Sequence, residues 1–291
     1  MNKIILGDNL EILKKLDSES VDLIYIDPPF FSNRTYEVVW GDKGEVRSFE
    51  DRFSGGIDHY IAWLKERVEQ MRRILKPTGS IFVHCDWHAN TYIRVQILDK
   101  IFGTNNFRGE IIWQRTNAHN DAKKKLAVLT DTIWYYTKSD KFTYNPQYVG
   151  YTDDYIEKVY KFVDANGRRF QSVDSRSPNP RPNLMYEYKG YKPHANGWAV
   201  SFEKMEELDK QGMLIFPKEK TGRIRFKKYL DEMQGVMVGN MWTDIPVLSS
   251  KSTERIGYPT QKPEALLVRL IQMASNEGDV VLDCFVGGGT T

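Results

Sequence analysis

The tetrapeptide Asp27-Pro28-Pro29-Phe30 follows an apolar stretch, residues 21–26, and combines groups suited to an amino group on a base. An exocyclic amino nitrogen is a poor nucleophile because its lone pair is delocalised into the ring, so an enzyme that alkylates it must localise that pair. The Asp27 carboxylate can accept one N–H and the carbonyl of Pro28 the other, while the prolines bring no competing donor. The Phe30 ring offers a flat face on which a flipped base can stack. The alternative interpretation is a strand that ends in a proline-rich turn.

A glycine-rich sequence follows a second apolar stretch at the far end of the chain. After residues 280–282 it reads Asp283-Cys284-Phe285-Val286-Gly287-Gly288-Gly289-Thr290-Thr291. Small residues allow the backbone to approach a ligand closely, and such loops after parallel strands line nucleotide and nucleoside pockets. No lysine stands between the glycines and the threonine pair, so the sequence is not a phosphate-binding P-loop.

Together the two segments resemble the amino-directed DNA methyltransferases that use S-adenosylmethionine (SAM). The tetrapeptide precedes the glycine loop, which matches the permuted β-type group, specific for adenine N6 or cytosine N4. The resemblance implies an α/β fold: a doubly wound, mostly parallel, Rossmann-like sheet with an inserted target-recognition region. It makes Asp27, Pro28, Pro29 and Phe30 the catalytic residues.

The resemblance also assigns the cofactor side. It implies that the glycine loop wraps the methionine end of SAM through Asp283, Phe285, Gly287, Gly289 and Thr290. It implies that Lys262, with Thr260 and Gln261, holds the SAM carboxylate. A cation at a helix start is unfavourable for the helix, which favours a functional role for Lys262 over that of an exposed lysine in a turn. Asp8 is expected to contact the SAM adenine or, alternatively, to be the N-cap of the next helix.

The composition is that of a globular protein with one large or two modest domains. The chain has 291 residues, of which 41% are hydrophobic and 27% charged, and a net charge of +2 that neither demands nor excludes nucleic acid. Cys85 and Cys284 are interpreted as buried thiols in a reducing cytoplasm. Five histidines and two dispersed cysteines form no metal-ligand pattern, so we expect no metal. No apolar run is long enough to span a membrane.

Hydrophobic periodicity predicts strands and helices in alternation, the doubly wound pattern. Strands are expected at 3–6, 21–27, 80–85, 110–114, 132–137 and near 280, and helices at 9–16, 58–75, 89–102, 201–211 and 264–276. The stripe on the second helix consists of Ile61, Leu64, Val68, Met71 and Leu75. Residues 32–56 are polar, aromatic and glycine-bearing, which predicts a mobile loop over the site. His84 is interpreted as structural.

Residues 140–245 are rich in Tyr, Lys, Asn, Gly and Pro, and their aromatic content is too high for disorder. We therefore predict three parts: 1–139, the catalytic part; 140–245, an inserted target-recognition region; and 246–291, the SAM-binding part. Basic residues form two clusters. The first, expected to contact DNA phosphates, consists of Arg108, Arg115, Lys123, Lys124 and Lys125. The second lies in the region expected to set the choice of sequence and consists of Arg223, Arg225, Lys227 and Lys228.

The resulting expectation is a cytoplasmic, site-specific methyltransferase for adenine N6 in double-stranded DNA, with a cognate restriction endonuclease as a candidate partner. Adenine is chosen because, in the family, Asp at the first position of the tetrapeptide goes mostly with adenine. The alternatives are a cytosine-N4 methyltransferase and an inactive DNA-binding fragment. The family continues beyond the position of Thr291 with a helix and a strand, which predicts a truncated chain that binds SAM weakly. The oligomeric state is left open.

Overall fold

The computed structural model describes residues 2–31, 35–40, 45–50, 55–117, 124, 126–249, 251–258 and 260–291, and for 35–40 and 45–50 the backbone alone. The chain divides into two compact units. The first consists of Met1–Gln147 together with Val238–Thr291, and the second of Tyr148–Met237.

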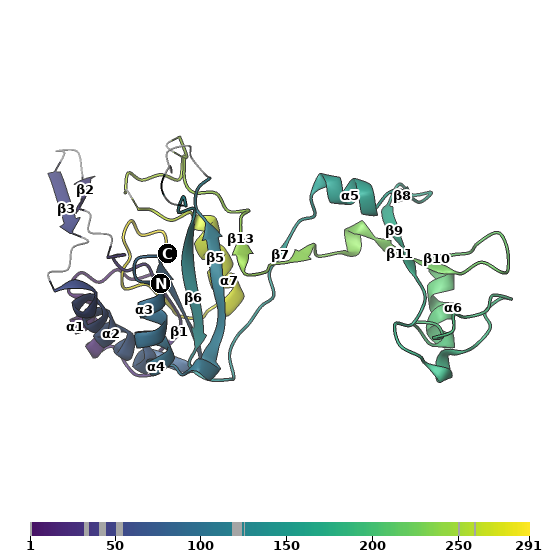
Figure 1. The fold of residues 1–291 in the computed structure, drawn as a ribbon, viewed down its shortest axis with the longest axis horizontal. Helices are drawn as coiled ribbons and strands as arrows, with labels where there is room; N and C mark the ends of the chain where they lie inside the picture. The colour runs from purple at the N-terminus through teal and green to yellow at the C-terminus, as the bar shows by residue number, and fades with distance from the viewer. Residues whose placement is uncertain are drawn as a thin grey trace. The chain divides into compact units, whose positions relative to one another are not determined.

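A six-stranded sheet organises the first unit, with the strand order β13-β5-β6-β4-β1-β14 (Figure 1). Its strands are β1 (Val21–Ile26), β4 (Leu75–Cys85), β5 (Phe107–Gln114), β6 (Thr130–Thr137), β13 (Met241–Trp242) and β14 (Val281–Leu282). The pairs β13–β5, β4–β1 and β1–β14 are parallel, whereas β6 is antiparallel to both of its neighbours. All strands except β6 therefore point the same way, and their carboxyl ends share one edge of the sheet.

Side chains along each strand alternate between two cores, one on each face of the sheet. In β1, Ile24 and Ile26 enter one core and Leu23 and Tyr25 the other. The first core is covered by α1 (Asn9–Lys15), α2 (Gly56–Ile74) and a helical segment made of α3 (Asn90–Tyr92), η1 (Ile93–Leu98) and α4 (Asp99–Ile101); a short turn, η2 (Thr104–Asn106), follows it. The second core is covered by α7 (Glu264–Ala274). Helices on both faces of a mainly parallel sheet confirm the predicted doubly wound α/β class.

The predicted apolar stripe packs α2 against the sheet. Ile61 is 5% exposed, and Leu64, Val68 and Met71 are fully buried. Leu75, predicted on the same stripe, instead begins β4 and is also buried. Helical spacing of apolar residues thus identified both the helix and the face that it buries.

The prediction of a strand at residues 3–6 is wrong. These residues adopt no regular structure, and Ile4 and Leu6 are 90% and 101% exposed. In the described part of the sheet no strand lies beside them. An apolar run needs a neighbouring strand to pair its backbone groups, and residues 3–6 have none there.

The prediction of a loop over residues 32–56 is wrong in part. β2 (Thr35–Trp40) and β3 (Glu45–Glu50) pair as an antiparallel hairpin, from Thr35 opposite Glu50 to Trp40 opposite Glu45. Sequence 35–40 is rich in the β-branched and aromatic residues that favour strands. Residues 32–34, 41–44 and 51–54 lie outside the described part of the chain.

The second unit has its own sheet and core. Its antiparallel sheet has the order β10-β11-β9-β8 and is formed by β8 (Phe162–Val163), β9 (Arg169–Asp174), β10 (Leu214–Ile215) and β11 (Arg225–Tyr229). The other elements are α5 (Asp153–Val159), η3 (Pro182–Leu184), α6 (Phe202–Lys210) and η4 (Leu230–Glu232). As predicted, α6 is capped by Ser201, whose side chain accepts from the N–H of Lys204. A separate core contains Tyr188, Tyr191, Trp198 and Met205.

The chain leaves and re-enters the first unit at adjacent points. The N–H of Val238 donates to the carbonyl of Gln147 at 2.8 Å. Immediately beyond these residues, β7 (Tyr148–Val149) pairs with β12 (Val236–Met237). The second unit is therefore an insertion that lies within the predicted region 140–245.

Candidate active site

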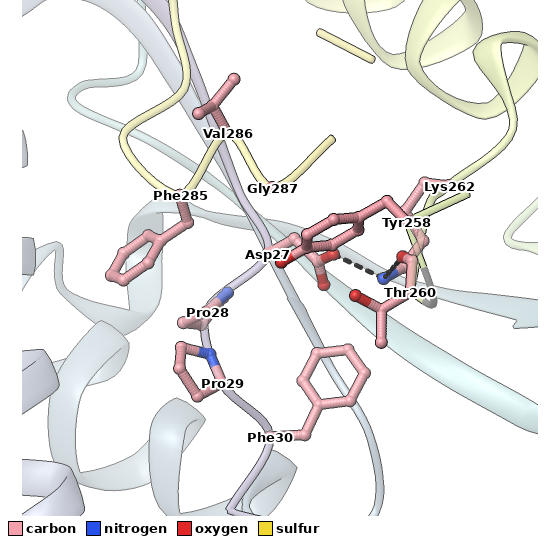
Figure 2. A pocket seen from close by; sticks show the side chains of 10 residues that line it. All are labelled: Asp27, Pro28, Pro29, Phe30, Tyr258, Thr260, Lys262, Phe285, Val286 and Gly287. Carbon is pink, nitrogen blue, oxygen red and sulfur yellow. Dashed lines mark hydrogen bonds and ion pairs between the residues drawn. The ribbon is translucent and has the colours of Figure 1, made fainter. Parts of the chain in front are cut away.

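The carboxyl ends of β1 and β14 meet at a pocket. The two strands are parallel neighbours, with Leu23 beside Val281 and Ile24 beside Leu282. Asp27 and Asp283 follow directly after these strands. A pocket of about 380 Å³ at this edge is lined by Asp27, Pro28, Pro29, Phe30, Tyr258, Thr260, Lys262, Phe285, Val286 and Gly287 (Figure 2). Crevices at the carboxyl ends of parallel strands are the usual ligand sites of this fold class.

Asp27 forms an ion pair with Lys262. The ammonium of Lys262 donates to Oδ2 of Asp27 at 2.5 Å and to the carbonyl of Thr260 at 3.3 Å, as the dashed lines in Figure 2 show. It also lies 5.1 Å from the centre of the Phe30 ring. The Lys262 and Asp27 side chains are 10% and 18% exposed. The pair thus joins two distant parts of the sequence inside the pocket.

The turn after β1 sends two successive aromatic rings to different places. Phe30 lines the pocket, whereas Phe31 packs on the core beneath α2 with its ring centre 5.6 Å from that of Tyr60. Phe31 has a φ of 59°, in the left-handed region that costs a non-glycine residue on the order of 1–3 kcal/mol. The hydroxyl of Tyr60 donates to the carbonyl of Pro29 at 2.7 Å. This bond and the packing of Phe31 hold the turn in its strained shape.

His84 supports Phe30 from within the protein. The two rings lie 5.6 Å apart, and His84 is fully buried. Its Nδ1 is 2.9 Å from the Tyr25 hydroxyl, and its Nε2 is 3.3 Å from Asp131. Burial opposes ionisation of Asp131, yet the hydrogen bond with His84 and the charges of His84 and Arg115 hold its pKa below the ordinary value. The structural role predicted for His84 is consistent with these contacts.

The glycine loop folds around Asp283. The N–H of Phe285 donates to Oδ1 of Asp283 at 2.8 Å, and the Thr291 hydroxyl donates to Oδ2 at 2.6 Å. Burial raises the pKa of Asp283 to about 6. Gly287 has a φ of 54°, and a Cβ on Gly288 would lie 3.0 Å from Ile256 and 3.2 Å from Tyr258. Glycine at these positions lets the loop turn tightly against Tyr258.

The structure brings most of the predicted site residues together. Those lining the pocket are Asp27, Pro28, Pro29, Phe30, Thr260, Lys262, Phe285 and Gly287, and an adjoining space of about 20 Å³ adds Gln261, Asp283 and Thr290. Tyr258 and Val286 also line the pocket without having been predicted. Tyr258 is the first residue of the segment 258–263 that resembles the family, and its large aromatic ring is the feature that indicates a wall of the site.

Two predicted residues lie elsewhere. Gly289 lines neither space. Asp8 also lines neither, and its Oδ1 accepts from the N–H groups of Leu10 and Glu11 at 3.0 and 3.2 Å. The alternative interpretation of Asp8, as N-cap of α1, is therefore the one that the structure shows. A contact between Asp8 and the cofactor stays a prediction.

Comparison with known proteins gives the family. A family model described as DNA methylase (N6_N4_Mtase) matches residues 21–291. The chain belongs to this family of N6 and N4 DNA methylases. Its members are SAM-dependent, and the predicted resemblance is confirmed.

Individual relatives match over the whole chain. The type II methyltransferase M.EcaI of Enterobacter cloacae is 29% identical over 100% of the chain and 63% of its own length. The StyLTI Mod subunit, from a type III restriction-modification enzyme of Salmonella typhimurium, is 27% identical over 100% of the chain and 49% of its own length. The DNA adenine methyltransferase YhdJ of Escherichia coli is 28% identical over 99% of the chain and 72% of its own length. The chain thus spans less than two thirds of the length of each of the first two relatives.

The structure divides the first of the two predicted basic clusters. Arg115 follows β5 at the pocket edge of the sheet and pairs with Asp131 at 3.3 Å. Arg108 lies at the opposite, amino end of β5, where its Nε donates to the Thr137 hydroxyl at 2.9 Å. Lys124 is exposed, while Lys123 and Lys125 lie outside the described residues. Arg108 and Arg115 therefore lie at opposite ends of β5, and contact of either with DNA stays a prediction.

The described part of the chain also bears on metal binding and on membrane insertion. Within it, no group of three or more His, Cys, Asp or Glu side chains is placed to hold a metal ion. None of the helices described there has the length and apolar character needed to cross a membrane.

Proposed function

We propose that the protein transfers a methyl group from SAM to the N6 amino group of adenine in double-stranded DNA, at a specific sequence. The observation that carries this proposal is the pocket itself. Two segments more than 250 residues apart, Asp27–Phe30 and Asp283–Gly287, line it from neighbouring strands. One segment offers acceptors and an aromatic face for a base, and the other offers a glycine loop for a cofactor.

The base side of the proposed reaction depends on Asp27 and Phe30. A flipped adenine would stack on Phe30, and its amino group would donate to Asp27 and to the carbonyl of Pro28. The amino nitrogen then attacks the methyl carbon, the C–S bond breaks with its electrons left on sulfur, and the nitrogen releases one proton through Asp27 to water. Holding both reactants in line is the main contribution of the protein.

The residues on the cofactor side fit SAM. SAM supplies an electrophilic methyl group on a sulfonium. Its amino-acid end carries an ammonium. The half-buried Asp283 carboxylate, which accepts hydrogen bonds from Phe285 and Thr291, is a suitable partner for it. The Gly287–Gly288 backbone packs so closely against Tyr258 that a Cβ on Gly287 or Gly288 would lie 3.3 or 3.2 Å from it, and it forms a close-fitting wall. Phe285 and Thr290 complete this side.

The choice of adenine rests on Asp27 and on one relative. Asp at the first position of the tetrapeptide favours adenine in the family, and YhdJ, a DNA adenine methyltransferase by name, aligns with nearly the whole chain. Asp27 alone does not distinguish adenine from cytosine as the target, since the two bases present equivalent amino groups. Cytosine N4 is therefore the alternative product.

The setting of the reaction is also part of the proposal. StyLTI Mod is a subunit of a restriction-modification enzyme, which supports a cognate restriction endonuclease as partner. A cytoplasmic location suits an enzyme that acts on DNA and whose cysteines, Cys85 and Cys284, are free thiols. Target recognition is assigned to the second unit, where Arg225, Lys227 and Lys228 lie on β11.

The decisive experiment identifies the methylated nucleoside. The purified protein is incubated with SAM and unmethylated DNA, and the DNA is digested to nucleosides for mass spectrometry. We expect N6-methyladenine. Asp27→Ala should lower its formation by at least about 100-fold, the usual effect of losing one oriented hydrogen-bond partner, while SAM binding is kept. Asp17→Ala, an exposed aspartate, is the control.

The other outcomes separate the alternatives. N4-methylcytosine would overturn the choice of adenine and leave the pocket assignment intact. Wild-type turnover in Asp27→Ala would overturn the pocket assignment. If the protein binds DNA but forms no methylated product and shows no SAM binding by calorimetry, the alternative of an inactive DNA-binding fragment is supported.

A further inference from the structure

Lys262 occupies an electrostatically unfavourable place for a lysine. It immediately precedes Pro263, the N-cap of α7, where the positive end of the helix dipole repels a cation. Its side chain is nine-tenths buried. Such a position requires a compensating negative charge, which the Asp27 carboxylate supplies at 2.5 Å.

The two oxygens of Asp27 have different surroundings. Oδ2 accepts from Lys262. Oδ1 is buried, and among the described residues no donor lies within hydrogen-bond distance of it. A buried carboxylate oxygen without a donor is unfavourable, whereas an amino group entering the pocket brings the N–H that it lacks. Because Lys262 holds one oxygen, the rotation of the carboxylate is fixed and the other oxygen is left for the base.

We infer that Lys262 is a positioning residue for Asp27 and acts on the base side of the pocket. Its ammonium orients the carboxylate so that Oδ1 receives the target amino group, and its position 5.1 Å from the Phe30 ring centre places it beside the stacking face. This role rests on the proposed amino-methyltransferase function. It differs from holding the SAM carboxylate, the role that the resemblance implies, because Lys262 contacts Asp27 and Thr260 in the structure.

The two roles predict different kinetics for Lys262→Met, which keeps an unbranched side chain, one atom shorter, and removes the charge. We expect its single-turnover rate to fall about 10- to 100-fold, as for a misplaced reacting group. The dissociation constant for SAM should stay within about twofold of wild type. Fluorescence of 2-aminopurine at the target position should still rise on binding, because Phe30 still receives the base. Lys262→Arg should recover part of the rate. Lys65→Met, on the surface of α2, is the matched control.

A double-mutant cycle with Asp27→Asn isolates the coupling. If Lys262 acts through Asp27, adding Lys262→Met to Asp27→Asn should change the rate by less than about twofold, because the oriented carboxylate is already gone. Additive losses would overturn the inference, and so would a loss of SAM affinity equal to the loss of rate. Should Lys262→Met alone fail to fold, the comparison of Asp27→Asn with Asp27→Asn/Lys262→Met, in which both charges are absent, still decides.

Failure of this inference is distinguishable from failure of the proposed function. If the wild-type protein forms no methylated nucleoside, the function itself is overturned. If it methylates DNA and the cycle is additive, only the role of Lys262 is overturned.

Discussion

Two carboxylates at neighbouring strand ends have opposite surroundings. Asp27 accepts a hydrogen bond from the ammonium of Lys262, whereas Asp283 accepts hydrogen bonds from the N–H of Phe285 and the hydroxyl of Thr291. Burial raises the pKa of Asp283 to about 6, against the hydrogen bonds that lower it, and the charge of Asp27 adds to the rise. Asp283 therefore changes its charge close to neutral pH.

SAM binding should depend on this charge. The affinity should fall about fourfold between pH 7.5 and pH 5.5, the change in ionised fraction for a group with a pKa near 6, because protonation removes the partner of the SAM ammonium. Calorimetric titrations at matched ionic strength measure it. Asp283→Asn should bind weakly and without this pH dependence. A pH-independent affinity in the wild type would contradict a role for the Asp283 charge.

The same pKa predicts the sign of a stability effect. The folded protein holds a proton on Asp283 up to about pH 6, whereas the unfolded chain releases it near 3.8. The folded state thus binds more protons in this window, so the contribution of Asp283 to stability is lost as the pH rises from about 4 to about 6. Urea unfolding at pH 4.5 and pH 7 should show a smaller loss in Asp283→Asn than in the wild type. An equal loss of unfolding free energy in both proteins would refute the contribution assigned to Asp283.

At the scale of residues, the sequence identified members of the site but not their pairing. The chemistry of Asp27 and Phe30 is visible in their types and order. Lys262 was identified too, yet its partner Asp27 is 235 positions away, and no local spacing links them. Asp8 had two local interpretations of similar weight, and the hydrogen bonds to the start of α1 show the cap.

The element that most constrains the site is the glycine loop after β14. A Cβ on Gly288 would press on Ile256 at 3.0 Å and on Tyr258 at 3.2 Å. Gly289 has a φ of 79°, and a Cβ there would meet nothing within 4 Å. The two glycines therefore offer a matched pair, in which one substitution tests space and the other tests backbone conformation.

Gly288→Ala should weaken SAM binding more than Gly289→Ala does. The first displaces Tyr258, a wall of the pocket, and should reduce the affinity about tenfold or more, a loss of ~1.4 kcal/mol. The second forces alanine into the left-handed region, which should lower the free energy of unfolding by about 1–2 kcal/mol. Calorimetry and urea unfolding measure the two effects. A reversed order of affinities would show that Tyr258 does not shape the cofactor space.

At the scale of elements, periodicity succeeded where one element carried a complete pattern. The stripe of α2 is an example, since Ile61, Leu64 and Val68 alone define a buried face. Residues 3–6 show the limit: their apolar character suits a strand, but a strand exists only with a neighbour, which lies beyond local information. In the hairpin of β2 and β3, residues 35–40 are strand-forming but residues 45–50 include three charged side chains, so local sequence alone does not predict the pairing.

The whole molecule is a sheet unit with an insertion between Gln147 and Val238. Composition predicted an inserted region at 140–245 but could not supply its strands, since β8 and β10 are two residues each and carry no periodicity. The second unit nevertheless has a core of its own, including the buried Trp198 and Met205. Each unit therefore has the apolar interior that an independent fold requires.

Excision of residues 148–237 should leave the first unit folded. If Gln147 is joined to Val238 by a short Gly-Ser linker, no strand of the six-stranded sheet is cut. The shortened protein should unfold cooperatively and bind SAM within roughly threefold of wild type. Sequence-specific methylation should be lost, as shown by sequencing the treated DNA with modified-base detection. The control inserts the same linker at the exposed turn Asn166–Gly167 with the unit kept. Retained site-specific methylation would place target choice outside the second unit.

The hydrogen bond between Val238 and Gln147 also has an evolutionary consequence. An insertion whose two ends are one hydrogen bond apart can lengthen, shorten or be replaced without stretching any connection of the host. Under the proposed division of roles, a lineage that exchanges this piece by recombination inherits Asp27, Lys262 and the glycine loop unaltered. New target sequences can then be acquired in one event, with no inactive ancestor in between.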